Sequence, residues 1–289
     1  MNMREVFLNS KHFSFIETGE IWQENPIFSL EKLSFEGKYI NFYNENQIIL
    51  GLTAEPLIFL EKLQFGGTNL APDIIIFASR HTSLTARPAF LVHTTGNWSN
   101  NADFGGNPQD LSKTSALLYK AGIESLREQI EKFNIPDFSL DMEVTHHGPT
   151  TLDIPLIFME LGSSKQEWVI KEAGELVASA IVNALFKYLD FKKEKTQEVG
   201  LGFGGTHYAP NFNRLISNTN IALSFICPKY YIQELNENLI EMMIDNTLEK
   251  IDYFIVDWKG TNSQDKKHLI PLLEEFDIPI RKTRSFSTI

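Results

Sequence analysis

The chain has 289 residues, 43% of them hydrophobic and 22% charged, with a formal net charge of −11 at pH 7. A chain of this length can bury a sizeable core, and its single cysteine excludes an internal disulfide and suits a reducing compartment. No apolar stretch approaches the roughly 20 residues that span a bilayer, and the first residues lack the apolar core of a signal peptide. We therefore expect a cytoplasmic protein without membrane contact. The acidic total disfavours broad contact with nucleic acid, because phosphate neutralisation requires lysine and arginine.

Residues 1–70 carry weak signals for secondary structure and none for chemistry. We expect them to form a divergent N-terminal part of a single domain, whose catalytic α/β core spans residues 71–289. The elements expected in this part are strands at residues 38–43 and 47–50, a turn at 44–46 and a short helix at 56–63.

Beyond residue 71, apolar runs that are typical of strands alternate with segments of helical periodicity. The continuous apolar run at residues 73–78 indicates a central strand covered on both faces, with residues 89–92 as its neighbour. Further strands are expected at residues 140–145, 154–159, 220–226 and 253–257, and helices at 111–133, 168–189, 235–251 and 269–276. This order indicates an α/β fold with a mixed, largely parallel central sheet and helices on both faces.

The stretch Glu143-Val-Thr-His-His-Gly-Pro-Thr150 runs from an alternating strand into two adjacent histidines and a turn. Side chains alternate across a strand, so Glu143 and His147 start on one face and His146 on the other. Glu143 and His147 can share a ligand only if the turn at Gly148 folds His147 back. The alternative is a strand end whose histidines are merely hydrogen-bonded.

Histidines recur where strand-like runs give way to loops. Five of the seven in the chain lie at such places, namely His81, His93, His146, His147 and His207. The last of them follows a glycine-rich segment, Gly200-Leu-Gly-Phe-Gly-Gly-Thr206. Loops that leave the carboxyl ends of strands line the ligand crevice of an α/β protein, so this pattern favours a functional site.

Five motifs, in this order and spacing, resemble the archaeal and plant type of D-aminoacyl-tRNA deacylase. They are Ser79-Arg-His81, His93-Thr-Thr-Gly96, Phe104-Gly-Gly-Asn-Pro108, Val144-Thr-His-His-Gly-Pro-Thr150 and Gly204-Gly-Thr-His-Tyr-Ala-Pro210. The resemblance covers residues 73–216, is weaker in the C-terminal third and is poor over the first seventy residues. It implies a phosphorylase/hydrolase-like α/β fold and a zinc ion. It also implies hydrolysis of the ester between a D-amino acid and the terminal ribose of tRNA. The expected partner is tRNA charged with a D-amino acid, and the expected state is a monomer or small homo-oligomer.

The resemblance also implies roles for the residues of these motifs. Imidazole and carboxylate are the usual ligands of catalytic zinc, and the expected ligands are His81, Glu143, His147 and His207, with His146 and Asp257 in reserve. The residues expected to carry catalysis are His146, His147, Thr150, Gly204, Gly205, Thr206 and His207. Those expected to bind the substrate are Arg80, His93, Thr94, Thr95, Gly96 and Tyr208.

A metal-free mechanism also stays open, with a histidine as general base and the backbone N–H groups of residues 204–206 holding the oxyanion. No serine nucleophile elbow is present, which disfavours a covalent acyl-enzyme. The glycines of this segment are expected to bring backbone close to the substrate α-carbon and so to select its chirality. The alternative is that they serve only a tight turn.

Two groups of cations near helix and chain ends are predicted to contact the tRNA backbone: Lys192, Lys193 and Lys195, and Arg281, Lys282 and Arg284. The alternative for the lysines is stabilisation of a helix C-terminus. Arg80 and Arg87 suit a phosphate, although Arg87 could equally keep an exposed loop soluble. Two other function classes remain open, a metallopeptidase- or phosphorylase-like enzyme acting on a small molecule and an RNA-binding module without catalysis.

Overall fold

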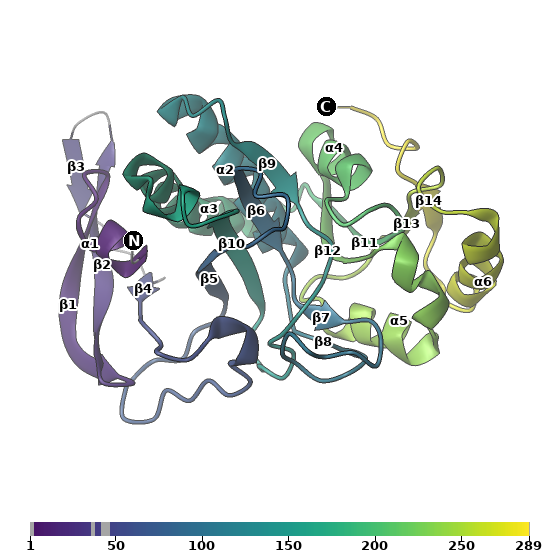
Figure 1. Ribbon diagram of the computed structural model, residues 1–289, viewed down its shortest axis with the longest axis horizontal. Coiled ribbons are helices and arrows are strands. Elements are labelled where there is room, and N and C mark those ends of the chain that lie inside the picture. The colour runs from purple at the N-terminus through teal and green to yellow at the C-terminus, as the bar shows by residue number, and fades with distance from the viewer. Residues whose placement is uncertain (1–2, 36–37, 42–46, 289) are drawn as a thin grey trace.

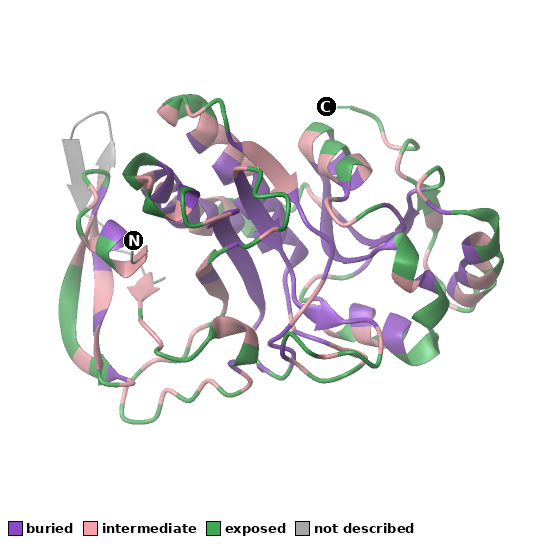
Figure 2. Cartoon of the chain, in the orientation of Figure 1, coloured by how far each residue is buried: buried purple, intermediate pink, exposed green. Residues whose placement is uncertain are grey.

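The computed structural model describes residues 3–35, 38–41 and 47–288, and in it three sheets lie side by side (Figure 1). An N-terminal antiparallel sheet lies at the left of this view, a mixed sheet in the centre and a parallel sheet at the right. The strands of the central and right-hand sheets are largely buried (Figure 2). No helix among the described residues is long and apolar enough to cross a membrane. The expected turn at residues 44–46 lies outside the described residues.

The N-terminal sheet consists of β1 (Phe13–Trp22), β2 (Asn25–Phe35), β3 (Lys38–Asn41) and β4 (Ile49–Leu50), and it follows helix α1 (Met3–Leu8). The last two strands are the expected ones, but each pairs with β2, so they do not form a hairpin with one another. The long β1–β2 hairpin was not expected, because the register shifts within β1 break its alternation of apolar and polar residues. The expected helix at 56–63 is the single 3₁₀ turn η1 (Leu57–Phe59). The buried side chains of Phe7, Phe13 and Leu30 join the main hydrophobic core.

The central sheet has the strand order β5-β10-β6-β9 and the bounds β5 (Ile75–Arg80), β6 (Ala89–His93), β9 (Ser139–Met142) and β10 (Leu156–Gly162). The prediction that residues 73–78 form a central strand beside residues 89–92 is wrong. Strand β5 lies at the edge, and β10 lies between β5 and β6, parallel to the first and antiparallel to the second. The apolar side chains of β5 instead pack into two hydrophobic clusters, one on each face of the sheet.

The two faces of β10 have different surroundings. Ile157, Met159 and Leu161 join the main core, in which α2 (Ala116–Phe133) and α3 (Lys171–Glu194) pack on one face of the sheet. Leu156 and Phe158 point to the opposite face, into a small cluster with Leu60 and Phe77. Helices therefore cover only one face of this sheet. Because side chains alternate along a strand, Glu160 lies on the same face as Leu156 and Phe158, which is the face without helices.

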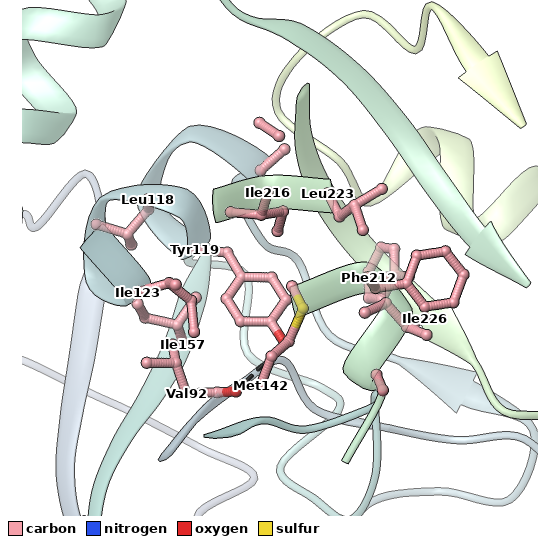
Figure 3. Packing of buried hydrophobic residues seen from close by; sticks show 14 of the residues in the cluster. Val92, Leu118, Tyr119, Ile123, Met142, Ile157, Phe212, Ile216, Leu223 and Ile226 are labelled. Carbon is pink, nitrogen blue, oxygen red and sulfur yellow. Dashed lines mark hydrogen bonds between the residues drawn. The ribbon is translucent and has the colours of Figure 1, made fainter. Parts of the chain in front are cut away.

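Helix α2 runs unbroken through Gly122, and it carries the central aromatic side chain of the core (Figure 3). The hydroxyl of Tyr119 lies 2.7 Å from the carbonyl oxygen of Glu143 and 3.2 Å from that of Val92. Burial raises the pKa of Tyr119 well above its usual value, so this hydroxyl keeps its proton as a donor. It thereby fixes the ends of β6 and β9 relative to one another.

The third sheet has the order β12-β11-β13-β14, with all strands parallel: β11 (Glu198–Phe203), β12 (Ile221–Cys227), β13 (Tyr253–Val256) and β14 (Ile280–Lys282). Its helices are α4 (Pro210–Asn218), α5 (Glu237–Asp245) and α6 (Ser263–Glu274). Helix α5 is shorter than the expected 235–251, because the chain leaves it at Asn246 and forms a bridge between Thr247 and Thr114. Gly202 faces Phe212 of α4, whereas Phe254 contacts Phe276 from the other side, so both faces are covered.

The chain that follows β9 joins the central sheet to the third one. The amide of Val144 donates to the carbonyl of His207 at 2.9 Å, and that of Thr145 donates to Ile226 of β12 at 3.1 Å. The hydroxyl of Thr145 accepts from the Ile226 amide at 3.0 Å. The carboxyl ends of strands from both sheets therefore meet at one place. The fold is the expected mixed α/β class, although its strands form separate sheets instead of one.

Candidate functional site

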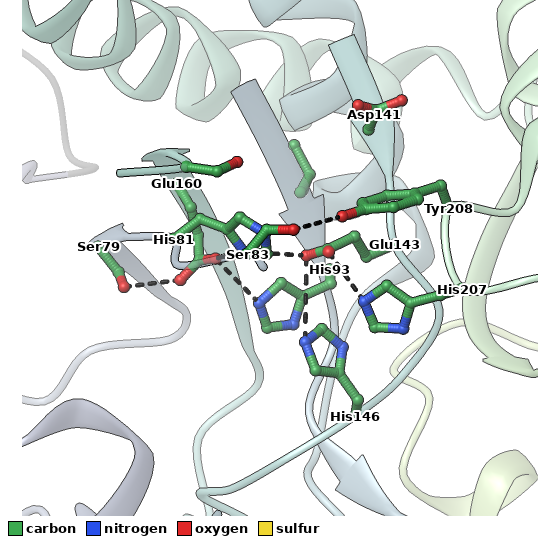
Figure 4. Close-up of polar contacts among 12 residues, drawn as sticks. Ser79, His81, Ser83, His93, Asp141, Glu143, His146, Glu160, His207 and Tyr208 are labelled. Atoms are coloured by element: carbon green, nitrogen blue, oxygen red, sulfur yellow. Dashed lines mark hydrogen bonds and ion pairs between the residues drawn. The ribbon is translucent and has the colours of Figure 1, made fainter. Parts of the chain in front are cut away.

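The five strand-end histidines converge where the two sheets meet. Figure 4 shows four of them, His81, His93, His146 and His207. The ring centroid of His146 lies 4.3 Å from that of His93, 4.5 Å from that of His147 and 4.8 Å from that of His207. Nδ1 of His81 lies 3.7 Å from Oε2 of Glu143. The side chains therefore gather at one place in the fold, and their role in a functional site stays a prediction.

A left-handed backbone at His147, with φ of 45°, turns this residue back toward the cluster. The next residue must be glycine, because a Cβ on Gly148 would lie 2.3 Å from the backbone nitrogen of Gly106 and 2.5 Å from the carbonyl oxygen of Ile58. The following peptide bond, to Pro149, is cis. The chain therefore folds back at Gly148, but it brings His147 to His93 and His146 and not into a ligand group with Glu143.

Three of the imidazoles form a hydrogen bond between Nδ1 and a backbone carbonyl oxygen. Nδ1 of His146 lies 2.8 Å from Val144 O, that of His147 2.6 Å from Gly148 O and that of His93 3.2 Å from Thr94 O. A carbonyl oxygen only accepts, so each Nδ1 carries a proton and Nε2 is the nitrogen left to bind another group. Burial, together with the neighbouring histidines, lowers the pKa of His146 well below its usual value and that of His147 to about 4. These two rings are therefore neutral.

Glu143 lies at the centre of the cluster and is fully buried. Its Oε1 is 2.9 Å from Nε2 of His207. Its Oε2 has no hydrogen-bond partner and lies 3.7 Å from Nδ1 of His81 and 4.0 Å from Nε2 of His146. One carboxylate oxygen is thus held by a histidine, while the other faces nitrogen atoms at distances too long for hydrogen bonds.

Glu160 of β10 is a second buried acid beside the cluster, and it is not among the residues expected from the sequence. Its Oε2 lies 3.1 Å from Nδ1 of His81, its Oε1 accepts from Ser79 Oγ at 2.7 Å, and Nε2 of His93 lies 3.8 Å from Oε2. Burial alone would raise the pKa of Glu160, but the hydrogen bond with His81 and the nearby His93 ring outweigh it and hold that pKa well below its usual range. Burial likewise lowers the pKa values of His81 and His93, and Glu160 more than reverses this, so both are raised.

Within the described part of the chain, three overlapping groups of side chains offer ligand atoms that lie within 4.8 Å of one another. They are His93, His146 and His147; Glu143, His146 and His207; and His81, Glu143 and Glu160. None of these groups contains all four expected ligands, since His147 and Glu143 are in different groups. His146, which was held in reserve, belongs to two groups. Asp257 joins none of them, because its carboxylate accepts from Asn211 and from the Gly260 amide.

Tyr230 is another side chain at the cluster that is not among the residues expected from the sequence. Its hydroxyl lies 3.3 Å from Nδ1 of His207, and burial raises its pKa to about 12, so it is protonated and donates. His207 then accepts at Nδ1 and donates from Nε2 to Glu143. Tyr230 lies in η3 (Lys229–Glu234), which is remote in sequence from every histidine motif.

Several residues expected to bind substrate hold the histidine loop in place, and their contact with a substrate stays a prediction. The hydroxyl of Thr94 bonds that of Thr145 at 2.7 Å, Thr95 Oγ1 donates to Pro149 O at 2.6 Å, and the Gly96 amide donates to His147 O at 2.8 Å. Thr150, expected to be catalytic, donates its hydroxyl to Asp110 at 2.7 Å. Arg80 stacks over the Trp168 ring, 4.9 Å from its centroid.

The suggestion that residues 204–206 form an oxyanion hole is contradicted for both glycines. The Gly204 amide donates to Cys227 O at 2.8 Å and the Gly205 amide to Gly260 O at 3.4 Å, so neither is free. Gly204 has a φ of 100°, and a Cβ there would lie 2.1 Å from Thr261 Oγ1. The glycines therefore serve the turn that delivers Thr206 and His207.

None of the six predicted RNA-binding residues belongs to the three groups of candidate ligands. The Lys192 ammonium lies 5.3 Å from the Tyr188 ring centroid, and Lys282 lies 4.6 Å from that of Trp258. Lys195 caps α3 with a φ of 55°, which agrees with the alternative role at a helix C-terminus. Contact of Lys192, Lys193, Lys195, Arg281, Lys282 and Arg284 with RNA stays a prediction.

Known proteins similar to this chain share one description. A family model described as D-aminoacyl-tRNA deacylase matches residues 68–281, which extends past the expected 73–216. A D-aminoacyl-tRNA deacylase of Thermococcus onnurineus is 34% identical over 281 residues, covering 96% of this chain and 93% of the relative. One of Pyrococcus furiosus is 32% identical, with 90% and 92% covered. The crystal structure of a conserved protein of unknown function matches with a TM-score of 0.77 and 30% identity, covering 99% of this chain and 93% of that one.

Proposed function

Because this chain belongs to the D-aminoacyl-tRNA deacylase family, and is thus a hydrolase of the aminoacyl ester of tRNA, we propose that its histidine cluster performs the hydrolysis with a bound zinc ion. The substrate is the ester between a D-amino acid and the 3′-terminal ribose. The observation that carries the proposal is the convergence of His93, His146 and His147. Each of them donates a hydrogen bond from Nδ1 to a backbone carbonyl oxygen.

These three residues fit a zinc ion by the chemistry of their donors. Three histidines are a common protein set in catalytic zinc sites, which keep a fourth position for water or substrate. Histidines that bind metal usually donate their other ring N–H to a carbonyl or carboxylate, which fixes the tautomer. His93, His146 and His147 all have this arrangement. The lowered pKa values of His146 and His147 keep both rings neutral, as a ligand must be.

Unpaired buried atoms support a cation in the cluster. Nε2 of His93 and Oε2 of Glu143 are both buried without a hydrogen-bond partner, as is Nε2 of His81. A buried polar atom without a partner costs about 1–3 kcal/mol. A cation bound by His93, His146 and His147 would give Nε2 of His93 a partner, and the proton that Glu160 favours on His93 would leave on binding, as metal binding generally requires.

A zinc ion held there would polarise the ester carbonyl and lower the pKa of a bound water to about 7. The protein groups beside it, Glu143 and His207, suit proton transfer. Oε2 of Glu143 is unpaired and faces the cluster, so it can accept a proton from the attacking water. Oε1 shares a proton with His207, whose side chain is 36% exposed and thus open to the ribose of the substrate. Tyr230 keeps His207 in the tautomer that donates to Glu143.

The test is release of free amino acid from tRNA charged with D- or L-tyrosine. The protein should release the D form and spare the L form. His146→Ala should cut turnover by at least about 100-fold, because His146 belongs to two of the three groups. The matched control is His12→Ala, since the His12 ring packs on Phe133 away from the cluster. Failure of the wild-type protein to release D-tyrosine would refute the activity, and full turnover by His146→Ala would refute the site.

A further inference from the structure

A groove of about 850 Å³ opens beside the histidine cluster. Its walls come from α2, β9, α4 and the loop after β5. We call it the arginine groove, and it is lined by Thr85, Arg87, Arg127, Ile130, Glu131, Phe138, Leu140, Asp141, Thr206, Tyr208, Pro210, Asn213, Arg214 and Ser217. This volume lies within the range of pockets that hold small ligands, roughly 300–1,000 Å³.

The groove is continuous with the proposed catalytic site through the residues on either side of His207. Thr206 and Tyr208 both line the groove. The ring of Tyr208 packs edge-on against that of His207, with the centroids 5.2 Å apart, and its hydroxyl lies 3.4 Å from Ser83 Oγ (Figure 4). A substrate whose ester lies at His207 therefore extends naturally into this groove.

The groove concentrates positive charge on an otherwise acidic chain. Three arginines from three separate elements face it, against the two carboxylates of Glu131 and Asp141. Arg87 pairs with Asp141, and Arg127 donates to the hydroxyl of Ser217. Arg214 is exposed and forms no ion pair with any described residue. An unpaired guanidinium is a ready site for a phosphate.

The groove also offers surfaces suited to bases. The Arg87 guanidinium stacks over the Tyr208 ring, 5.4 Å from its centroid, which makes a flat cationic platform. Ile130, Phe138 and Leu140 add apolar lining. Aromatic platforms beside a positively charged groove are the usual means of binding single-stranded nucleic acid without sequence preference.

We propose that the arginine groove binds the unpaired nucleotides at the 3′ end of the tRNA, with backbone phosphate at Arg127 and Arg214 and a base stacked on Tyr208. This inference rests on the proposed function, because the ester at the cluster fixes which end of the RNA lies nearby. It gives an acidic protein a local means of holding a polyanion. It also differs from the earlier prediction for Lys192, Lys193, Lys195, Arg281, Lys282 and Arg284, none of which lines the groove.

The test uses Arg214→Glu in the full-length protein, with Lys250→Glu as a control of equal charge change. Lys250 is exposed and precedes β13, at the end of the third sheet away from Gly204. Binding of uncharged tRNA is measured at several salt concentrations. Arg214→Glu should weaken binding at least about 10-fold at low salt and reduce the slope of log Kd against log salt by about one unit, as loss of one phosphate contact does. Equal effects of the two variants would overturn the proposal.

Removal of the three 3′-terminal nucleotides from the tRNA identifies which part of the RNA occupies the groove. If it is the 3′ end, truncation weakens binding to the wild type, and Arg214→Glu adds little further loss with truncated tRNA, because the two changes remove one contact. Fully additive losses would assign Arg214 to another part of the tRNA and overturn the proposal.

The D-aminoacyl ester of adenosine separates the groove from the chemistry. Arg214→Glu should hydrolyse this small ester within about 2-fold of the wild-type rate while losing at least about 10-fold in kcat/KM on D-aminoacyl-tRNA. Equal loss on both substrates would show that Arg214 acts on the site itself and would contradict the groove. Absence of D-ester hydrolysis by the wild type would instead refute the proposed function.

Discussion

The Nε2 atom of His207 lies 2.9 Å from Oε1 of Glu143, although 64 residues separate the two in the chain. His207 follows a strand of the third sheet and Glu143 follows a strand of the central sheet, so this bond connects the two sheets across the site. The amide of Val144 donates a second hydrogen bond between the two sheets, to the carbonyl oxygen of His207. The acid/base pair is thus held by the packing of the two sheets.

Glu143→Gln should abolish most of the hydrolysis and leave the fold intact. Glutamine has nearly the same shape and still accepts from His207, but it cannot take a proton from water. Loss of a general base typically costs about 100- to 10,000-fold in turnover, and kcat for D-aminoacyl-tRNA measures it. The melting temperature of the variant serves as control. A variant that keeps more than a tenth of wild-type kcat would remove Glu143 from the chemistry.

Glu160→Gln should strengthen zinc binding near neutral pH and leave the proposed ligand set complete. The carboxylate of Glu160 lies 3.8 Å from Nε2 of His93 and raises the pKa of His93, so it favours a proton on the nitrogen proposed to bind the metal. This proton must leave when the metal binds, so we expect the variant to hold zinc more tightly in a competition titration with a chelator. Zinc affinity equal to that of the wild type would limit Glu160 to a structural role.

Gly204→Ala should unfold the protein at lower temperature without altering the preference for D substrates. The backbone at Gly204 has a φ of 100°, and the added methyl would lie 2.1 Å from Thr261 Oγ1. We expect a destabilisation of more than about 1 kcal/mol in urea unfolding. The ratio of D to L turnover in the remaining folded enzyme should match that of the wild type. A fall in this ratio at unchanged stability would restore the idea that the glycines select chirality.

Lys120→Met should destabilise the fold, because Lys120 is the donor for a cluster of buried carbonyl groups. Its ammonium lies 3.3 Å from Ile216 O, 2.6 Å from Thr219 O and 3.1 Å from Ile221 O, where α4 ends and β12 begins. Loss of the donor should cost about 2–4 kcal/mol in urea unfolding, since each carbonyl left without a partner is penalised. A variant as stable as the wild type would show that these carbonyls find other donors.

The same residue should make stability depend on pH in alkaline solution. Burial lowers the pKa of Lys120 from 10.5 to about 8, partly offset by Glu124. Between pH 8 and pH 10.5 the unfolded chain binds more protons than the folded chain, so the free energy of unfolding rises with pH. This gain in stability is lost as the pH falls back to about 8. The difference in unfolding free energy between wild type and Lys120→Met should grow by up to about 3 kcal/mol from pH 8 to 10.5. A difference that stays constant with pH would contradict the shift.

The sequence predicted where the site is but not how its members group. His81, His93, His146, His147 and His207 were recognisable because each ends a strand-like run, and the carboxyl ends of strands meet in α/β folds. The grouping of His147 with His93 depends on the left-handed backbone at His147 and on contacts of Gly148 with residues about 40 and 90 positions earlier. Such contacts between distant segments leave no local pattern.

The missed residues have a similar explanation. Glu160 is one acid in an otherwise apolar run, so the run was read as a buried strand, and only the position of β10 between β5 and β6 gives this carboxylate its histidine partners. Tyr230 and Arg214 belong to segments without motifs, and they reach the site because the third sheet packs beside the central one. A buried acid in a strand was the one available signal, because such a group needs a partner.

The most direct test of the central claim is the dependence of turnover on bound zinc. The protein is stripped of metal, zinc is added back in steps, and bound zinc and hydrolysis of D-aminoacyl-tRNA are measured on the same samples. We expect turnover to rise in proportion to bound zinc up to about one ion per chain, and His93→Ala to bind little zinc and gain little activity. Full turnover by metal-free protein would contradict the account, leaving Glu143 and His207 to act without a metal.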